Sequence, residues 1–141
     1  MRLCDVNVLL HALRQDSPDH PAALAWLDQE INGSANYGVS PQILSSVIRL
    51  STSTRIFRQP TPVSEALHFS SVLLNQGNAV VITPGASHWG IFSHYCQILD
   101  LAGNDIPDAW LAALAVEWDC EWISLDQGSK RFDRLRWKSP W

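Results

Sequence analysis

Three aspartates stand where chain segments of different type meet, and these residues are the best candidates for chemistry. Asp5 follows the short apolar segment 2–4, which is typical of a buried central strand. Asp126 follows the segment 121–125, which is β-rich and bounded by polar residues. Asp108 lies in the first turn of an expected helix. Because ligands bind at the carboxyl ends of strands in an open α/β sheet, we expect the three carboxylates to converge on one sheet edge.

Three carboxylates at one point predict a site for Mg²⁺ or Mn²⁺ rather than zinc, because these cations prefer hard oxygen ligands. Asn7 is either a turn residue or an amide that holds Asp5 in place. Each aspartate also has a structural interpretation, since aspartates form turns after strands and interact favourably with the dipole in a first helical turn. Their joint placement favours the metal site.

The helix that carries Asp108 is the best-marked element of the sequence. Asp105 is its expected N-cap, and Pro107 is tolerated in the first turn, where its missing N–H costs nothing. Four alanines form a wall thin enough to lie close against a sheet: Ala109, Ala112, Ala113 and Ala115. This helix therefore positions Asp108 against the strand that leads to Asp126.

The remaining chain alternates between the two element types. Strands are expected at 37–40, 79–82 and 135–137, and helices at 11–14, 19–31, 41–50, 63–74 and 88–101. Alternation of this kind implies parallel strands joined by right-handed crossovers, and thus an α/β fold. The 141 residues are enough for one domain and too few for two.

Composition narrows the class of protein. With 46% hydrophobic and 17% charged residues the chain is globular. It has no apolar run long enough to span a bilayer and no signal-peptide pattern, so we expect a cytoplasmic protein. The three cysteines form no CxxC pair and are expected to be buried free thiols. No HExxH, GxSxG, P-loop or GxGxxG motif is present, which leaves zinc proteases, serine hydrolases and nucleotide-binding enzymes without support.

Basic residues are focused although the net charge is −4. Eight of the ten lie in two clusters: Arg49, Arg55 and Arg58, then Lys130, Arg131, Arg134, Arg136 and Lys138. Such clusters can bind a phosphate backbone, or they can form a solvated basic face, and the sequence favours neither. Trp89 and Trp110 lie in helical patterns that favour packing or an interface. Trp137 and Trp141 lie among basic residues. We expect them either to pack inside the protein or to stack on nucleic-acid bases.

Several motifs together resemble a PIN domain of the VapC toxin type found in bacterial toxin–antitoxin pairs. They are Cys-Asp-Val-Asn-Val-Leu-Leu at 4–10, Ile48-Arg49 followed by Arg55-Ile-Phe, Asn104 through Ala115, Ser124-Leu-Asp, and Leu135-Arg-Trp. The resemblance covers nearly the whole chain. It implies a single domain, 1–141, with a three-layer α/β/α sandwich around a mainly parallel sheet.

The resemblance also implies a function, a metal-dependent endoribonuclease that acts on structured RNA. Asp5, Asp108 and Asp126 are the implied catalytic residues and ligands of Mg²⁺ or Mn²⁺. Supporting roles fall to Asn7, Ser46 and Asn104, and RNA binding to Arg49, Lys130, Arg131 and Arg134. The implied partners are the RNA substrate, a cognate antitoxin and a second copy of the chain, with no membrane.

One position departs from the family pattern. Family members commonly carry a glutamate three residues before the arginine of the third helix, and here Ser46 precedes Arg49. No acidic residue occurs between Glu30 and Glu65, so this helix brings no carboxylate to the site. The alternative function is therefore a degenerate PIN-fold module that binds RNA or a protein without cutting. A phosphoryl-transfer aspartate enzyme ranks last, because it would need a second acid where Asn7 stands.

Overall fold

A single five-stranded sheet organises the computed structural model, which describes residues 1–141. Its strands are β1 (Arg2–Cys4), β2 (Tyr37–Val39), β3 (Ala79–Val81), β4 (Glu121–Ile123) and β5 (Arg136–Lys138). They lie in the order β3-β2-β1-β4-β5, and every neighbouring pair is parallel. The parallel sheet inferred from the alternation of elements is confirmed.

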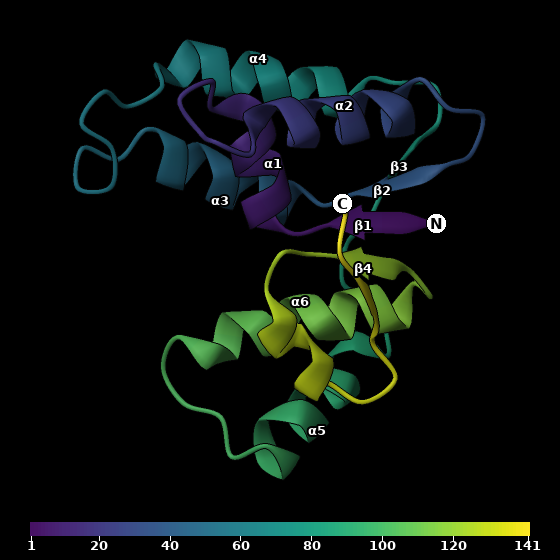
Figure 1. Cartoon of the computed structure of the whole chain (residues 1–141). Helices are drawn as coiled ribbons and strands as arrows, with labels where there is room; N and C mark the ends of the chain where they lie inside the picture. Colours follow the sequence, from purple (N-terminus) through teal and green to yellow (C-terminus); the bar gives the residue numbers. More distant parts are fainter.

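Helices cover both faces of this sheet (Figure 1). On one side lie α1 (Val6–Leu13), α2 (His20–Ile31), α3 (Pro41–Ser51) and α4 (Val63–Leu74), and on the other α5 (His88–Ile98) and α6 (Asp105–Glu117). A short 3₁₀ helix, η1 (Gln127–Arg131), connects β4 to β5. The three-layer α/β/α sandwich is therefore confirmed.

The order of the strands explains where a site must form. The chain proceeds from β1 to β2 and β3 in one direction, then crosses back to β4 on the other side of β1. Right-handed crossovers place the helices of these two halves on opposite faces. The direction changes at β1, and the crevice at the carboxyl end of such a strand is where open α/β sheets bind ligands. Asp5 occupies that point.

Helix α6 packs closely because its inner surface is made of small side chains. Ala109, Ala113 and Ala115 have no exposed surface, and Ala112 is also buried. On the sheet, Leu3 and Trp122 are buried in the main hydrophobic core. Because these small side chains let α6 lie close to the sheet, the helix is held in place there. Its first turn, which carries Asp108, is therefore held in place as well.

Several element boundaries differ from the sequence-based expectation; strand β4, for example, ends at Ile123 rather than Leu125. Helix α1 begins at Val6 rather than His11, because the Asp5 carboxylate accepts a hydrogen bond from the Val6 amide and caps the helix immediately after β1. Helix α5 ends at Ile98, and Asp100 then adopts a left-handed φ of 49°. Helix α6 already includes Asp105, so the expectation that Asp105 is its N-cap is wrong.

The remaining expectations concern membranes and thiols. No helix has both the length and the apolar character required to cross a bilayer. All three cysteines are free, with Cys120 buried and Cys4 and Cys96 half-buried. Burial raises the pKa of the Cys120 thiol to about 11, so this thiol stays protonated at neutral pH.

Candidate active site

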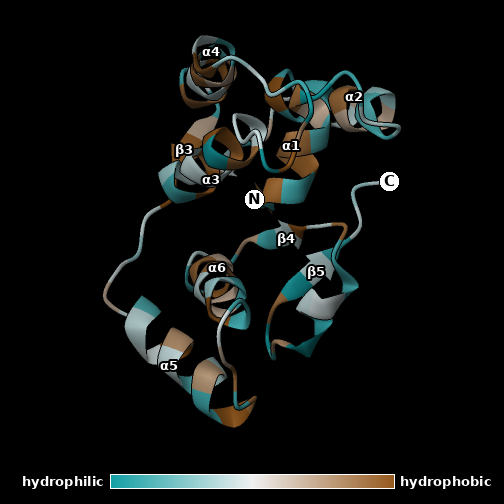
Figure 2. Cartoon of the chain, turned by 90° about the vertical axis from the view of Figure 1, so that its left-hand side faces the viewer, coloured by the Kyte–Doolittle hydropathy of each residue, from teal (hydrophilic) through white to brown (hydrophobic).

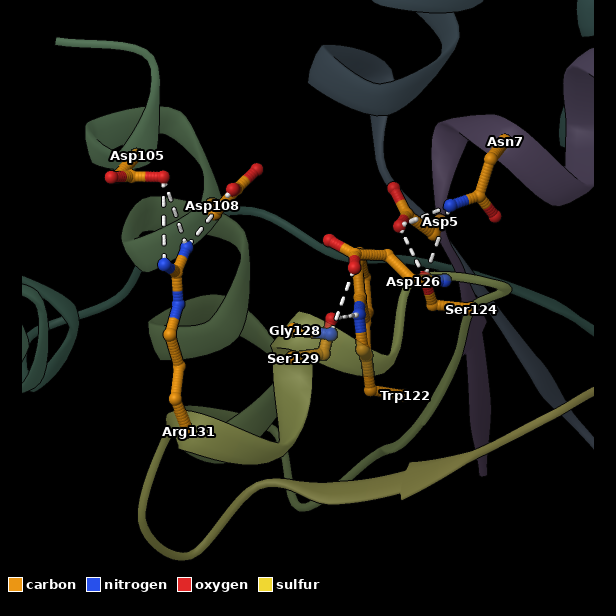
Figure 3. Close-up of polar contacts among 10 residues, drawn as sticks. All are labelled: Asp5, Asn7, Asp105, Asp108, Trp122, Ser124, Asp126, Gly128, Ser129 and Arg131. Carbon is orange, nitrogen blue, oxygen red and sulfur yellow. Dashed lines mark hydrogen bonds and ion pairs between the residues drawn. The ribbon is translucent and has the colours of Figure 1, made fainter.

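Asp5 is the most firmly held carboxylate of the site (Figure 3). Its Oδ1 accepts a hydrogen bond from the Val6 amide at 2.6 Å. Its Oδ2 accepts from Asn7 Nδ2 at 2.9 Å and from Ser124 Oγ at 2.6 Å. Since both oxygens are engaged by donors on α1 and just beyond β4, the carboxylate has one orientation at the end of β1.

Asn7 and Ser124 connect the ends of β1 and β4. Asn7 Nδ2 also donates to Ser124 Oγ at 3.1 Å, and Asn7 Oδ1 accepts from the Leu125 amide at 3.2 Å. Ser124 Oγ accepts a further bond from the Asp126 amide at 3.0 Å. Asn7 is therefore an amide that holds Asp5, rather than only a turn residue. The role of Ser124 was missed, although its position two residues before a strand-end aspartate was a usable signal.

Asp126 lies at the surface directly after β4. Its Oδ1 accepts a hydrogen bond from the Gly128 amide at 2.8 Å and caps η1. A Cβ on Gly128 would lie 3.0 Å from this same oxygen, so glycine permits the close turn. One carboxylate oxygen, Oδ2, accepts no hydrogen bond from the chain.

Asp108 is paired with an arginine through one of its two carboxylate oxygens (Figure 3). Arg131, on η1, places Nη2 3.2 Å from Asp108 Oδ2 and 3.4 Å from Asp105 Oδ1. Asp105 is thus an ion-pair partner of Arg131. Asn104, expected to support the site, is exposed and makes no capping hydrogen bond with its side chain.

The three carboxylates act on one another electrostatically. Burial raises the pKa of Asp5, the hydrogen bonds from Ser124 and Val6 oppose this, and the charges of Asp108 and Asp126 raise it further. Burial likewise raises the pKa of Asp108, opposed by Arg131 and reinforced by Asp126 and Asp105. Ionised carboxylates at this edge therefore destabilise each other, and a bound cation relieves that repulsion.

The donor set fits a hard divalent cation. The site offers carboxylate, amide and hydroxyl oxygens, and neither sulfur nor imidazole belongs to it. In the metal-free chain no three His, Cys, Asp or Glu side chains lie close enough together to hold a metal ion, and Asp108 Oδ2 is paired with Arg131. On α3, Ser46 is half-buried and Arg49 exposed, and this helix supplies no carboxylate.

Ion pairs within the chain occupy most of the C-terminal basic cluster. Arg136 pairs with Asp119, Lys138 with Glu121, and Lys130 lies 4.4 Å from the centre of the half-buried Trp137 ring. Together with Arg131, these residues are held by their own chain. Four basic residues make neither an ion pair nor a ring contact: Arg49, Arg55, Arg58 and Arg134.

Comparisons with known proteins agree on the family. A family model described as the PIN domain matches residues 2–137. Ribonuclease VapC43 of Mycobacterium tuberculosis (strain ATCC 25618 / H37Rv) is 39% identical over 139 residues, which cover 98% of this chain and 95% of that protein. Ribonuclease VapC25 of the same strain is 36% identical over 140 residues, 99% of each chain.

A solved structure has the same fold at much lower identity. The crystal structure of VapBC2 from Rickettsia felis bound to a DNA fragment from their promoter matches with a TM-score of 0.66 at 14% identity, over 96% of each chain. Fold, full-length identity and family model lead to one conclusion. The chain belongs to the PIN-domain family, within the group of VapC ribonucleases.

Proposed function

We propose that the chain is a Mg²⁺- or Mn²⁺-dependent endoribonuclease, the toxin of a toxin–antitoxin pair, which cuts structured RNA. One observation carries the proposal. At the strand edge where this topology binds ligands, the charges of Asp108 and Asp126 raise the pKa of Asp5, and the charge of Asp126 raises the pKa of Asp108. Three hydrogen-bond donors fix Asp5 at this edge. Carboxylates kept close together without mutual stabilisation are typical of a site built for a cation.

The residues of the chain have distinct tasks in this reaction. A bound divalent cation supplies positive charge that stabilises the reacting phosphodiester and makes water a better nucleophile at neutral pH. Asp5 provides the fixed ligand, since Asn7 and Ser124 orient it. Asp126 offers its Oδ2 atom, which accepts no bond from the chain. Arg131, which lies beside Asp108, is a guanidinium that can bind a phosphate oxygen.

Metal removal tests the proposal directly. Purified protein incubated with a labelled pool of structured RNA should cut it with Mn²⁺, stop with EDTA, and resume when Mn²⁺ is restored in excess. The Asp126→Asn variant should lose most of this activity while it keeps the cap on η1, because an asparagine oxygen can still accept from Gly128. Equal cleavage by the variant, purified in parallel, would mean that a contaminating ribonuclease does the cutting.

The alternative function, a degenerate module that binds RNA or protein without cutting, is favoured by Ser46. Because α3 has no carboxylate, the site offers only three aspartates as charged ligands. A cation bound there would need water for its other ligands, and Mg²⁺ tolerates such coordination, so cleavage is still compatible with Ser46. The same incubation separates the two functions. RNA that is bound but never cleaved, with Mg²⁺ or Mn²⁺, identifies the degenerate module.

The free arginines after the middle of α3 are the best candidates for phosphate contacts. Arg49, Arg55 and Arg58 have no partner in the chain, whereas Arg136 and Lys138 are paired. The slope of log affinity against log salt should become less steep by about two when the three arginines are replaced by alanine. Each phosphate contact on single-stranded RNA contributes roughly 0.7 to that slope. Anisotropy titrations of a labelled RNA, on the inactive Asp5→Asn protein, measure this slope.

The matched control removes paired charges from the same chain. The Arg136→Ala, Lys138→Ala protein should keep a nearly unchanged salt slope, because Asp119 and Glu121 already neutralise these cations. A larger change of slope in this control than in the triple variant would return RNA binding to the C-terminal cluster.

A groove between α2 and α4 fits the proposed antitoxin. It measures about 310 Å³ and is lined by both helices and the end of α1, with Leu24, Phe69 and Val72 among its apolar residues. Leu24 is 46% exposed, so much of its apolar side chain is not packed against the rest of the chain. Apolar grooves of this kind bind the apolar face of an amphipathic segment.

Co-expression tests this partner. Leu24→Asp should abolish co-purification with the antitoxin encoded alongside, because it buries an unpaired charge in the groove. Ile98→Asp, at an even more exposed apolar position on α5 across the sheet, should leave the complex intact. A complex that survives Leu24→Asp would place the interface elsewhere. We also propose a homodimer in the absence of the antitoxin, which sedimentation velocity measures.

A further inference from the structure

Four aromatic rings form a continuous cluster on the α5/α6 layer. His88, Trp89 and Phe92 come from α5 and Trp110 from α6. Ring centres lie 4.2 Å apart for His88 and Trp110, 5.1 Å for Phe92 and Trp110, and 5.4 Å for Trp89 and Phe92. His88 is buried, with its ring nitrogen bonded to the Trp110 carbonyl, whereas Trp89 is 66% exposed. The aromatic cluster thus begins in the core and ends in solvent.

The aromatic cluster lies close to Asp108 along α6, although on another face of this helix. Trp110 follows Asp108 by two residues on α6, and its Nε1 donates to Gln42 Oε1 at 2.6 Å. Gln42 lies in the first turn of α3, which starts where β2 ends, and β2 is paired with β1. Figure 2 shows the first turn of α5 beside α6, on the side away from β5. Trp110 therefore connects α6 to the first turn of α3 two residues beyond Asp108, and the exposed Trp89 lies against Trp110.

The negative charge next to the aromatic cluster, that of Glu117, is already bound by the backbone amides of Gly85 and Ser87, each at 2.9 Å. Helix α5 contains no acidic residue. The face of α3 that includes Gln42 continues, at helical spacing, through Ser45 or Ser46 to Arg49. Exposed aromatic rings beside amide, hydroxyl and guanidinium groups are the combination with which proteins bind unpaired nucleotides, because rings stack on bases and the polar groups contact the backbone.

Internal packing and self-association explain Trp89 less well. Its ring contacts only Phe92 and, at 6.5 Å between centres, Trp110, so most of its surface packs against nothing. A stable dimer buries about 800 Å² on each partner. One exposed tryptophan beside two half-buried rings is too little apolar surface for that, but it matches the size of a single base.

We propose that Trp89, supported by Phe92 and Trp110, stacks on an unpaired nucleobase of the RNA strand whose phosphodiester lies at Asp5, Asp108 and Asp126. The inference rests on the proposed function, because it assigns a position to part of the same substrate. It makes Trp89 a residue that selects RNA with an unpaired base near the cleavage site, and it gives the Trp110–Gln42 bond the task of holding the stacking surface next to the carboxylates.

Binding of a short fluorescein-labelled single-stranded RNA to the inactive Asp5→Asn protein tests the proposal. Adding Trp89→Ala should weaken the affinity about fivefold to 100-fold, the cost of one lost base–aromatic stack. Trp89→Phe should restore most of it. Trp118→Ala is the matched control, since Trp118 is also exposed but lies ten residues beyond Asp108, about 15 Å along α6. Its affinity should not change.

RNA that carries abasic sites distinguishes stacking from contact with the backbone. The protein with Trp89 intact should bind an RNA with abasic sites no better than the Trp89→Ala protein binds the intact RNA. For the Trp89→Ala protein, abasic sites should cause no further loss of affinity. Equal affinity of the parent and Trp89→Ala proteins for intact RNA would overturn the proposal. So would a Trp89→Ala defect that is the same for abasic RNA, or dissociation of a dimer by this substitution in sedimentation velocity.

Failure of this inference can be told apart from failure of the proposed function. Binding is measured without metal on a protein that does not cleave, and cleavage is measured on the protein with Asp5 intact. Mn²⁺-dependent cleavage together with a silent Trp89→Ala substitution removes only the stacking site. Absence of cleavage together with a Trp89-dependent affinity removes only the nuclease.

Discussion

With Mn²⁺ at 100 times its dissociation constant, the chain is expected to unfold about 9 °C higher than in EDTA, and the Asp5→Asn variant is expected to show no such shift. A ligand that binds only the folded state at this concentration adds about 2.7 kcal/mol. For 141 residues, an unfolding entropy of about 2.1 cal/mol/K per residue converts this into the stated temperature. Differential scanning fluorimetry of both proteins, with Mn²⁺ and with EDTA, measures it.

Asp5 carries this prediction because it is the proposed ligand whose carboxylate is held in one orientation between the two strand ends. Asparagine has the same size but removes the charge that the cation needs, and the donors Asn7 and Ser124 then meet a neutral group. Loss of metal charge at the reacting phosphate, worth roughly 4 kcal/mol, should also reduce the cleavage rate about 1,000-fold. Asp100→Asn is the control, since Asp100 is exposed and its left-handed φ suits asparagine, and its Mn²⁺ shift should be complete.

The dependence of the Mn²⁺ shift on pH follows from the raised pKa of Asp5 and Asp108. A carboxyl whose pKa is higher in the folded than in the unfolded chain stabilises the fold below its unfolded pKa, and this stability is lost as pH rises through the folded pKa. Metal-free protein therefore loses stability as pH rises through the folded pKa values of the two groups. The Mn²⁺ shift should be larger above these pKa values than below them. An equal shift at both, or in Asp5→Asn, would mean that the cation binds elsewhere.

Local signals in the sequence were sufficient for the fold and for the positions of the aspartates. Helix α4 has the predicted bounds, 63–74, because an apolar stripe runs between a Pro-rich segment and an Asn-Gln-Gly-Asn turn. The placement of Asp5 and Asp126 needed only short apolar strands that each end in an aspartate, and the structure has β1 and β4 there. Alternation of elements then gave the parallel sheet.

Side-chain contacts between distant segments were beyond such reasoning. Nothing local shows that Arg131 pairs with Asp105 and Asp108, or that Ser124 donates to Asp5 across 119 residues of chain. The same limit applies to the basic clusters, which look alike in sequence although only Arg49, Arg55 and Arg58 are free as a group. The pairing of cations is decided by which carboxylates the fold brings near them. The helical pattern around Trp89 likewise predicts packing or an interface, because the sequence does not show that this side chain is exposed.

Substitution of Arg14 by alanine is expected to cost the fold about 3 kcal/mol, although Arg14 belongs to neither basic cluster. Its guanidinium is 7% exposed and lies 3.7 Å from the centre of the Phe57 ring. Nη1 donates to the Gln59 carbonyl at 2.8 Å and to Thr61 Oγ1 at 3.3 Å. Alanine leaves the buried Thr61 hydroxyl and the part-buried Gln59 carbonyl without this donor and removes the packing under Phe57. Such losses amount to about 1–3 kcal/mol for each unsatisfied group.

This arginine also joins stability to RNA binding, because the segment it holds, 52–62, carries Arg55 and Arg58. Urea unfolding of Arg14→Ala should show the lower stability, and its melting temperature should fall by about 10 °C. Well below that temperature the variant should still be folded, yet it should bind RNA more weakly, since two free cations are no longer held in place. Arg49→Ala is the comparison, expected to weaken RNA binding with little change in stability, because Arg49 is exposed and unpaired. If Arg14→Ala melts like the wild type, the segment is held by its own backbone bonds, such as Thr61 N–H to the Ser51 carbonyl, and Arg14 is dispensable.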